Sequence, residues 1–139
     1  KDSPYLSCAS RYSISLRSGL GCRGVAPGSI TTQSFYLGAL KAAAELEWVD
    51  VVLARINPFG IKMDGPPEEV APVLQAAHAN GKGVIGMKIL GEGQAADKMA
   101  ESLEYVLGLG CLDAMTIGFV NPGEVDGAIR EIGAVGAAA

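Results

Sequence analysis

Hydrophobic residues recur with helical spacing in four stretches of the chain between residues 37 and 132. Apolar positions at i, i+3, i+4 and i+7 place one continuous stripe on one face of an α-helix. Each stripe therefore predicts one amphipathic helix. The stripes that we predict to be buried are Leu37, Leu40 and Ala44; Val70, Val73, Leu74 and Ala77; Ala96, Met99, Leu103 and Val106; and Val125, Ala128, Ile129 and Ile132.

Three short, largely apolar runs separate these helices, at residues 49–56, 84–87 and 113–119. Parallel strands covered by helices have this nearly continuous apolar character. We therefore predict an α/β domain of three parallel strands with flanking helices, and we expect Trp48 to pack against the helix layer. The pattern does not distinguish an open doubly wound sheet from part of a (β/α)8 barrel, and three strands cannot close a barrel.

Capping residues mark the ends of two predicted helices. Pro67 suits the first turn of the second helix, and Asn80-Gly81 is typical of a helix end. At the last helix, Asn121 can cap, Pro122 suits the first helical position, and Glu124 can reach back to the Asn121 amide. These residues predict where both helices start and where the second one ends.

Residues 1–36 differ from the rest of the chain in composition. They are rich in Ser, Gly and Arg, contain one acidic residue and show no sustained helical or strand period. We therefore predict an irregular segment at residues 1–36 and one α/β domain at residues 37–139. Lys1 stands where an initiator Met would be expected, which suggests a processed, truncated or incomplete sequence.

Length and charge limit the classes of function. With 139 residues and 49% hydrophobic content, the chain can form one modest globular core. A net charge of -4 without a sustained basic cluster gives no electrostatic reason to expect nucleic acid or an anionic membrane as a partner. The apolar runs are well short of the roughly 20 residues that span a bilayer. We therefore expect a soluble, cytoplasmic protein that acts on small molecules.

The cysteine and histidine content indicates neither disulfides nor a metal site. Cys8, Cys22 and Cys111 lie far apart and are odd in number, without metal-ligand spacing such as C-x-x-C. His78, the single histidine, lies near the end of a predicted helix, where a cation interacts favourably with the helix dipole. We expect reduced thiols, no bound metal and no catalytic role for His78.

Candidate functional groups follow the predicted strands, where α/β folds place their sites. Arg55 and Asn57 lie at the end of the first strand, Lys88 and the loop Gly91-Glu92-Gly93 at the end of the second, and Asn121 after the third. Amides at the last helix start, beside a glycine-bearing loop, can hold a phosphate. The alternative is that the glycines only permit tight turns. Lys88 can pair with a phosphate, form a Schiff base or point to solvent.

Two strings in this region resemble the C-terminal half of the aldo/keto reductases. They read WVDVVLARINPFGIKMDGPPEEVAPVLQAAHANGKGVIGMKILGEG and YVLGLGCLDAMTIGFVNPGEVDGAI. The resemblance covers residues 37–133 and is closest to the bacterial branch whose seventh strand reads GKGVIGMK. It implies the C-terminal half of a (β/α)8 TIM barrel. The intact barrel of that family binds NADP or NAD and transfers a hydride to or from a small carbonyl substrate.

The resemblance also implies which residues contact the cofactor. The segment 87–93 matches the family's seventh-strand loop, which folds over the cofactor, and the segment 118–124 matches the eighth-strand segment near the adenosine phosphate. Asn57 is similar in place to residues beneath the nicotinamide. The cofactor-binding residues so implied are Asn57, Met87, Lys88, Leu90, Gly91, Gly93, Gly118, Phe119, Asn121 and Glu124.

Two departures from the family pattern limit these expectations. Glu124 stands where a basic residue near the 2′-phosphate is common, which leaves the choice between NADP and NAD open. The family's catalytic Asp, Tyr, Lys and His belong to the first four strands, and nothing before Leu37 matches those motifs. The resemblance therefore implies no catalytic residue here. We expect a fragment with negligible activity of its own, with residues 1–36 derived from a shifted reading frame or a foreign segment.

Two other functions are consistent with the residues. A non-catalytic half-barrel would form a homo-oligomer through the sheet edges that an incomplete barrel exposes. A different barrel enzyme would use Lys88 as a Schiff-base lysine beside a phosphate site. Neither the substrate nor the oligomeric state follows from the sequence.

Overall fold

The computed structural model describes residues 6–8, 13–16, 31–33 and 36–138. These residues form short strands, α-helices and two 3₁₀ turns. The strands are β1 (Leu6–Cys8), β2 (Ser13–Leu16), β3 (Thr31–Gln33), β4 (Val51–Arg55), β5 (Gly83–Met87) and β6 (Ala114–Gly118). The helices are α1 (Leu37–Glu45), α2 (Pro67–Ala79), α3 (Met99–Gly108) and α4 (Pro122–Ala138), and the 3₁₀ turns are η1 (Gly91–Gly93) and η2 (Ala96–Lys98).

The strands form one open sheet in the order β1-β2-β6-β5-β4-β3. β3, β4, β5 and β6 are parallel neighbours, whereas β2 pairs antiparallel with β6, and β1 antiparallel with β2. The three parallel strands that the apolar runs predict are confirmed as β4, β5 and β6. The described part of the sheet does not close into a barrel, because β1 and β3 are its two edges.

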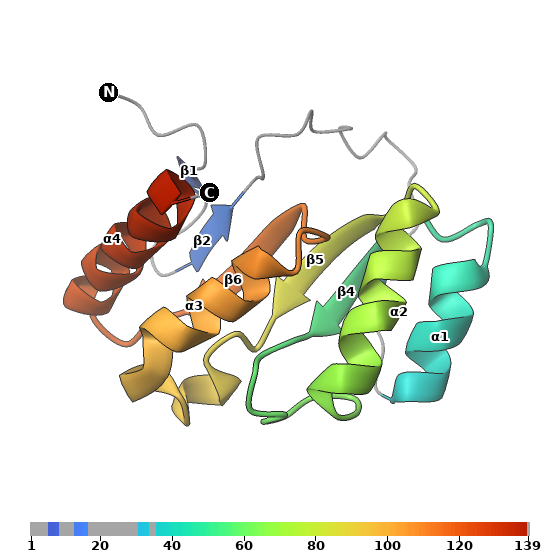
Figure 1. The fold of residues 1–139 in the computed structure, drawn as a ribbon, viewed down its shortest axis with the longest axis horizontal. Helices are drawn as coiled ribbons and strands as arrows, with labels where there is room; N and C mark the ends of the chain where they lie inside the picture. The colour runs from blue at the N-terminus through green and yellow to red at the C-terminus, as the bar shows by residue number, and fades with distance from the viewer. Residues whose placement is uncertain (1–5, 9–12, 17–30, 34–35, 139) are drawn as a thin grey trace.

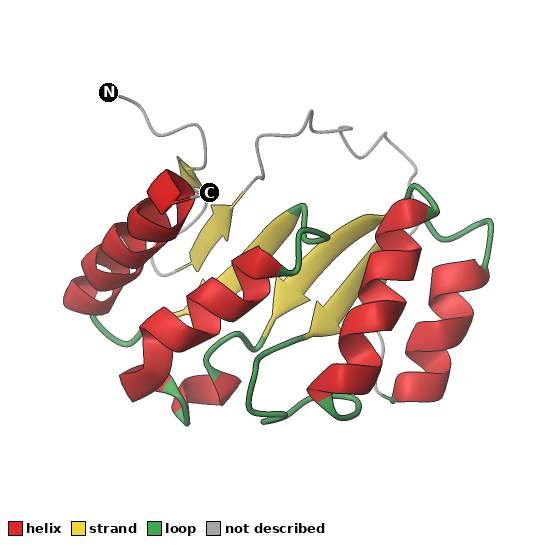
Figure 2. Ribbon diagram, in the orientation of Figure 1, coloured by secondary structure: helices red, strands yellow, loops and turns green. Residues whose placement is uncertain are grey.

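The parallel strands follow one another across the sheet in their chain order. The connections through α1, α2 and α3 therefore all step in the same direction, and right-handed crossovers then place these helices on one face of the sheet. Figures 1 and 2 show this face toward the viewer, with α4 next to α3. A doubly wound sheet would instead reverse direction and carry helices on both faces.

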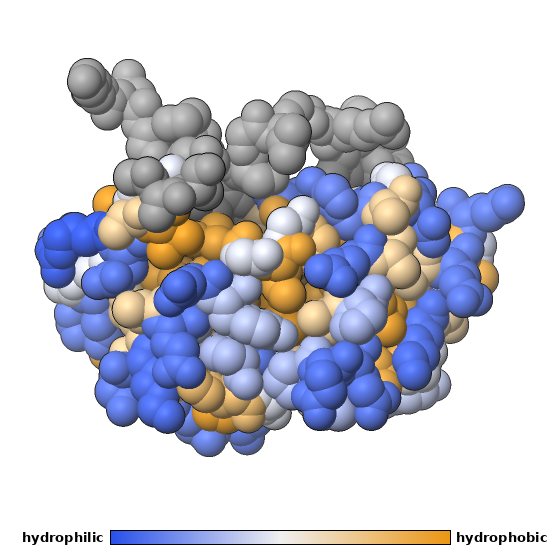
Figure 3. Space-filling view, viewed as in Figure 1, coloured by the Kyte–Doolittle hydropathy of each residue, from blue (hydrophilic) through white to orange (hydrophobic). Residues whose placement is uncertain are grey.

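Apolar side chains from the helices and from one face of the sheet form the core. Val52 and Ala54 of β4, Leu74 of α2 and Leu103 of α3 are fully buried there. Burial of each large aliphatic side chain contributes roughly 1.5–3 kcal/mol. Figure 3 shows hydrophilic residues over much of the helix-covered face, with a band of hydrophobic residues between them. The helices therefore bury one stripe each and leave their outer faces in solvent.

The predicted helix boundaries are confirmed where capping residues mark them. α2 begins at Pro67, and Asn80 is its C-cap residue, followed by Gly81 with a φ of 83°. Glycine adopts this left-handed conformation without steric penalty, which ends the helix. α4 begins at Pro122, directly after the capping residue Asn121. None of the helices among the described residues is long and apolar enough to cross a membrane.

The segment 1–36 differs from the prediction of an irregular chain, because its described parts are strands. β3 pairs with β4, and β2 pairs with β6. The parallel strands β4 and β6 would otherwise be sheet edges with unpaired backbone groups, and added strands satisfy those groups. Pairing of this kind depends on the neighbouring strand, so no local period in residues 1–36 reveals it.

Three residues that we predicted to pack in the helix layer differ from that prediction. Trp48 is 56% exposed rather than packed against the helices, because it lies in the turn after α1. Ile129 is 36% exposed, since the contact of α4 with the core centres on Ala128 and Ile132. Ala96 lies in η2 rather than in α3. Ala96 and Ile129, two residues of the predicted buried stripes, are therefore exposed.

The buried side chain of Lys82, which directly precedes β5, contacts the connection between α1 and β4. Its Nζ donates to the carbonyl oxygens of Leu46, at 2.6 Å, and Val49, at 2.9 Å. Leu46 is the C-cap residue of α1, where a cation also complements the helix dipole. A buried ammonium without such partners would be strongly destabilising. Lys82 therefore holds the α1–β4 connection against the start of β5.

The substitution Lys82→Met is expected to lower the free energy of unfolding by about 2–3 kcal/mol, because two charge-assisted hydrogen bonds to backbone carbonyls are lost. Urea denaturation followed by circular dichroism measures the change, with an unchanged m value as the sign of an intact fold. Lys41→Met, at an exposed position of α1, is the matched control and should change stability by less than about 0.5 kcal/mol. Equal losses in both variants would contradict the role of Lys82.

Candidate functional site

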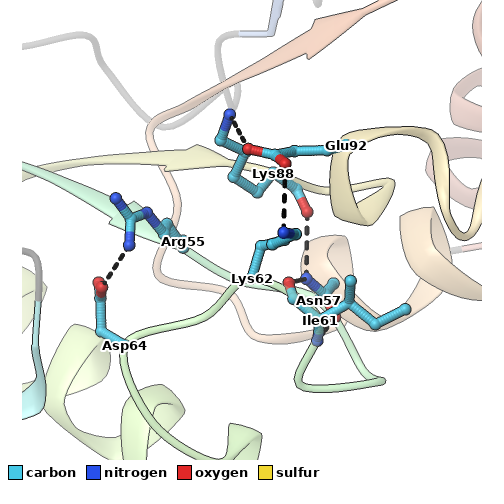
Figure 4. A network of polar contacts seen from close by, with 7 residues as sticks. All are labelled: Arg55, Asn57, Ile61, Lys62, Asp64, Lys88 and Glu92. Carbon is cyan, nitrogen blue, oxygen red and sulfur yellow. Dashed lines mark hydrogen bonds and ion pairs between the residues drawn. The ribbon is translucent and has the colours of Figure 1, made fainter.

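Two loops meet at the carboxyl ends of β4 and β5, and the side chain of Asn57 joins them (Figure 4). Asn57 is fully buried. Its Nδ2 donates to the carbonyl oxygens of Ile61, at 2.8 Å, and Lys88, at 3.1 Å. Its Oδ1 accepts from the backbone N–H groups of Phe59 and Ile61, each at 3.1 Å. Both donors of the amide and its acceptor are thus used to hold the β4–α2 loop against the start of the β5–α3 loop.

Three non-glycine residues in these loops have left-handed backbone conformations. Lys62, Lys88 and Glu92 have φ values of 56°, 57° and 61°. Such a conformation costs roughly 1–2 kcal/mol for a residue with a Cβ, and residues held in it gather at functional sites. The tertiary contacts of the two loops therefore impose a backbone that these residues would not adopt alone.

The same three side chains meet in one charged group. Glu92 Oε1 lies 2.8 Å from Lys88 Nζ, and Glu92 Oε2 lies 3.8 Å from Lys62 Nζ. The hydrogen bond from Lys88 lowers the pKa of the Glu92 carboxyl, and the charges of both lysines lower it further. The carboxylate is therefore ionised at neutral pH and shared unequally, with Lys88 as its closer partner.

Gly91 lies where the two loops make close contact. Its φ is 55°, and a Cβ at this position would lie 2.7 Å from Ile61 Cγ2. Any side chain there would push the loops apart. Nearby, Lys98 Nζ lies 4.7 Å from the centroid of the Phe59 ring, a cation–π contact between the same two loops. Glycine at residue 91 therefore permits the close packing of the two loops.

Side chains at the start of α4 form hydrogen bonds with backbone amides at the same helix end. Asn121 Oδ1 accepts from the Glu124 N–H at 3.1 Å, and Asn121 Nδ2 donates to Glu124 Oε1 at 2.8 Å. The prediction that Glu124 reaches the Asn121 backbone amide is wrong in one detail, since Glu124 Oε2 accepts from the Val120 N–H at 3.0 Å. A carboxylate thus already lies at the positive end of the helix dipole.

A cleft of about 610 Å³ lies between the loops that follow β5 and β6. Its volume is in the range of about 300–1,000 Å³ that small-molecule sites occupy. The residues that line it are Met87, Lys88, Ile89, Leu90, Glu92, Gly93, Ala96, Thr116, Ile117, Gly118, Phe119, Val120 and Glu124. Most are apolar, and the charged groups are one ammonium and two carboxylates. The cleft therefore offers an apolar surface with a few charged groups that can orient a ligand.

Most of the predicted cofactor-binding residues meet in this cleft, because the parallel pairing of β5 with β6 brings their loops side by side. The remaining three, Asn57, Gly91 and Asn121, are outside its lining and make the loop and cap contacts described above. Their contact with a cofactor stays a prediction. The predicted residues in the lining are Met87, Lys88, Leu90, Gly93, Gly118, Phe119 and Glu124.

Six lining residues are outside the predicted set of cofactor-binding residues, namely Ile89, Glu92, Ala96, Thr116, Ile117 and Val120. Thr116, Ile117 and Val120 belong to β6 and to the loop after it, and Val120 is 87% exposed. Exposure alternates along β6, with Thr116 and Gly118 on the exposed side. A polar residue and a glycine at alternate positions of an otherwise apolar strand were the signal that could have identified this face.

A second cavity of about 280 Å³ shares Glu92 with the cleft and is also lined by Arg55, Lys62 and Met63. Arg55 Nη1 donates to Asp64 Oδ1 at 3.0 Å. Burial raises the pKa of the Asp64 carboxyl, and the Arg55 charge partly opposes this rise. Sequence reasoning noted Arg55 but missed Lys62, because the β4–α2 loop that carries Lys62 lacks any periodic signal.

The other reactive side chains in the described part of the chain form no second cluster. His78 Nε2 lies 3.5 Å from Asp113 Oδ1. Asp113 directly precedes β6, so this pair lies at the opposite end of that strand from the cleft. Cys111 is a free, buried thiol, and burial raises its pKa to about 11, so it stays protonated at neutral pH. Cys22 lies outside the described residues, as does the side chain of Cys8. No group of three His, Cys, Asp or Glu residues that could hold a metal ion occurs in the described part of the chain.

Lys88 does not have the surroundings of a Schiff-base lysine. Its side chain is 36% exposed, and its ammonium is paired with Glu92. A lysine that attacks a carbonyl is activated by desolvation in an apolar pocket or by a neighbouring cation. The geometry therefore favours a role for Lys88 in pairing with an anionic group.

Comparisons with family models, with curated proteins and with solved structures found no significant match to this chain. The resemblance to the aldo/keto reductases therefore stays a prediction. A functional assignment depends on the geometry of the two cavities and on the residues that line them.

The substitution Asn57→Ala is expected to lower the free energy of unfolding by about 3 kcal/mol, because several buried backbone groups lose their partner. Thermal unfolding measures the loss, and amide hydrogen exchange should show weaker protection at Phe59 and Ile61. Asn80→Ala is the matched control, since Asn80 makes one longer side-chain bond, Nδ2 to Ala44 O at 3.3 Å. Unchanged exchange in the loop of Asn57→Ala would contradict this account.

Proposed function

We propose that the cleft between the β5 and β6 loops binds a nicotinamide dinucleotide, and that the chain is the cofactor-binding half of an oxidoreductase similar to the aldo/keto reductases. The observation that supports the proposal is that predicted residues from two separate segments, 87–93 and 118–124, line one cleft. The bound nucleotide would supply or accept the hydride in carbonyl reduction or alcohol oxidation. The residues described here would bind and orient it.

The lining of the cleft fits the chemistry of such a ligand. Leu90, Phe119 and Val120 offer apolar surface to a flat ring. A Cβ at Gly93 or Gly118 would meet no atom within 4 Å, so the backbone at both glycines is open to close approach. The Lys88 ammonium can pair with one negative charge of a pyrophosphate, in exchange for part of its contact with Glu92.

The start of α4 supports NAD rather than NADP as the better ligand. The Val120 and Glu124 amides are already bonded to side-chain oxygens of this capping group, and the Glu124 carboxylate adds a negative charge there. A 2′-phosphate placed near this helix start would meet like charge instead of free amides. NAD carries no such phosphate and avoids the repulsion.

We infer further that the sheet is the C-terminal half of a (β/α)8 barrel. The consecutive order β3-β4-β5-β6, with helices on one face, supports this inference. The cleft also lies at the carboxyl ends of the strands, where barrel enzymes hold their ligands. A complete barrel has eight parallel strands and about 250 residues. Turnover would therefore require the strands that carry the catalytic groups.

NADH is expected to bind the chain saturably, and more tightly than NADPH, in titrations monitored by nucleotide fluorescence. Gly118→Val should weaken NADH binding by about tenfold or more, because the new side chain would enter the cleft. No oxidation of NADH is expected with added aldehydes, since the chain provides no catalytic tetrad.

The matched control is Gly108→Val at the end of α3, where a Cβ also meets no atom within 4 Å but which does not line the cleft. This variant should bind NADH like the unmodified chain. The proposal fails if NADH does not bind saturably, or if both valine variants weaken binding equally.

A second candidate function is self-association through the sheet face opposite the helices. Leu53, Ile85 and Ala114 are aligned in register across β4, β5 and β6 and are each partly exposed. They alternate with the core residues, so they point away from the helix layer. An aligned apolar row is a suitable contact for the same row of a second copy.

Sedimentation equilibrium is expected to show a dimer if this second function holds. Leu53→Gln should then shift the protein toward monomer, because a polar group would enter the apolar contact. Leu46→Gln, at a leucine that is 39% exposed outside this row, should leave the dimer intact. A folded protein that is monomeric at all concentrations would rule out pairing.

A further inference from the structure

The cavity lined by Arg55, Lys62, Met63 and Glu92 has the composition of an anion site. Arg55 lies at the end of β4, and Lys62 reaches across from the β4–α2 loop toward Glu92 (Figure 4). Two cations, one from β4 and one from the loop that follows it, thus border a space of about 280 Å³, which is small for a ligand site and suits a compact molecule or a single acidic group.

The Glu92 carboxylate lies beside Lys62, where an external anion would bind. Its Oε1 accepts a hydrogen bond from Lys88 at 2.8 Å, whereas Oε2 lies 3.8 Å from Lys62 Nζ, beyond hydrogen-bonding distance. Both side chains of the longer pair are about half exposed, and ion pairs of this kind are weak. An incoming anion can therefore take Lys62 while Glu92 keeps its bond to Lys88.

The backbone holds this arrangement ready. Lys62 and Glu92 both have left-handed φ values, which the contacts through Asn57 and Gly91 maintain. Their side chains are therefore directed by the loop packing rather than by their own preferences. Arg55 is fixed in turn by its bond to the buried Asp64 carboxylate.

We propose that this cavity binds the carboxylate or phosphate group of a small organic acid between Arg55 and Lys62, with Glu92 as a competing internal anion. Guanidinium and ammonium groups are the usual protein partners of both anions. Because Glu92 also lines the nucleotide cleft, the bound acid lies beside it. The identity of the substrate alone rests on the proposed function. If the cleft binds a nicotinamide dinucleotide for hydride transfer, the substrate is a carbonyl compound that carries an acidic group.

The test is an NMR titration of the full chain with inorganic phosphate, at constant ionic strength maintained with chloride and without nucleotide. Saturable shifts are expected at the backbone amides of Lys62 and Glu92. Glu92→Gln should tighten phosphate binding about two- to fivefold, because the competing charge is removed. Lys62→Met should weaken it about tenfold, since one charged partner is lost. Lys41→Met, on the exposed side of α1, should leave it unchanged.

The proposal is overturned if the shifts do not saturate, if chloride produces them equally, or if Lys62→Met binds phosphate like the unmodified chain. In a separate competition experiment, displacement of phosphate by NADH would also overturn the proposal, because the anion site would then belong to the nucleotide. Displacement of phosphate by acetate shows that the site also accepts a carboxylate, and failure of acetate to displace it shows that the site prefers a phosphate group. The titration contains no nucleotide, so it succeeds or fails independently of NADH binding.

Discussion

The buried amide of Asn57 is the contact on which the carboxyl edge of the sheet depends. It uses both donors and its acceptor on backbone groups of two loops, one after β4 and one after β5. Because these groups are buried, water cannot replace the amide without a large rearrangement. The left-handed backbone at Lys62, Lys88 and Glu92 persists only while the loops remain joined. The wall that both cavities share, which Glu92 forms, therefore depends on the contacts of one side chain.

Charge is distributed around these cavities in a way that links them. Glu92 lines both, and it is bonded to Lys88 on the cleft side and lies near Lys62 on the other. A ligand that draws one lysine away from Glu92 changes the electrostatic field at the second cavity, since the carboxylate is then shared differently. A nucleotide in the cleft and an acid in the smaller cavity would thus affect each other through a single carboxylate.

Much of the fold was predictable because its signals are local. The stripe of Val70, Leu74 and Ala77 and the helix end at Gly81 depend on spacing and backbone preference within one turn or two. The strands of residues 1–36 were not predictable, because β3 forms by pairing with β4, β2 by pairing with β6 and β1 by pairing with β2, and they carry no period of their own. The solvent exposure of Trp48 likewise depends on where the helix layer ends rather than on its neighbours in sequence.

The sequence by itself determined the helices and the central strands, since hydrophobic periodicity and capping act over short distances. Its resemblance to the aldo/keto reductases implied the segments 87–93 and 118–124 as candidate binding loops. Only the tertiary structure decided which of those residues line an open cleft. It placed Gly93 and Gly118 beside an open cleft, and it committed Asn57, Gly91 and Asn121 to internal contacts. A residue's accessibility is set by its partners across the fold, and those partners lie far from it in the chain.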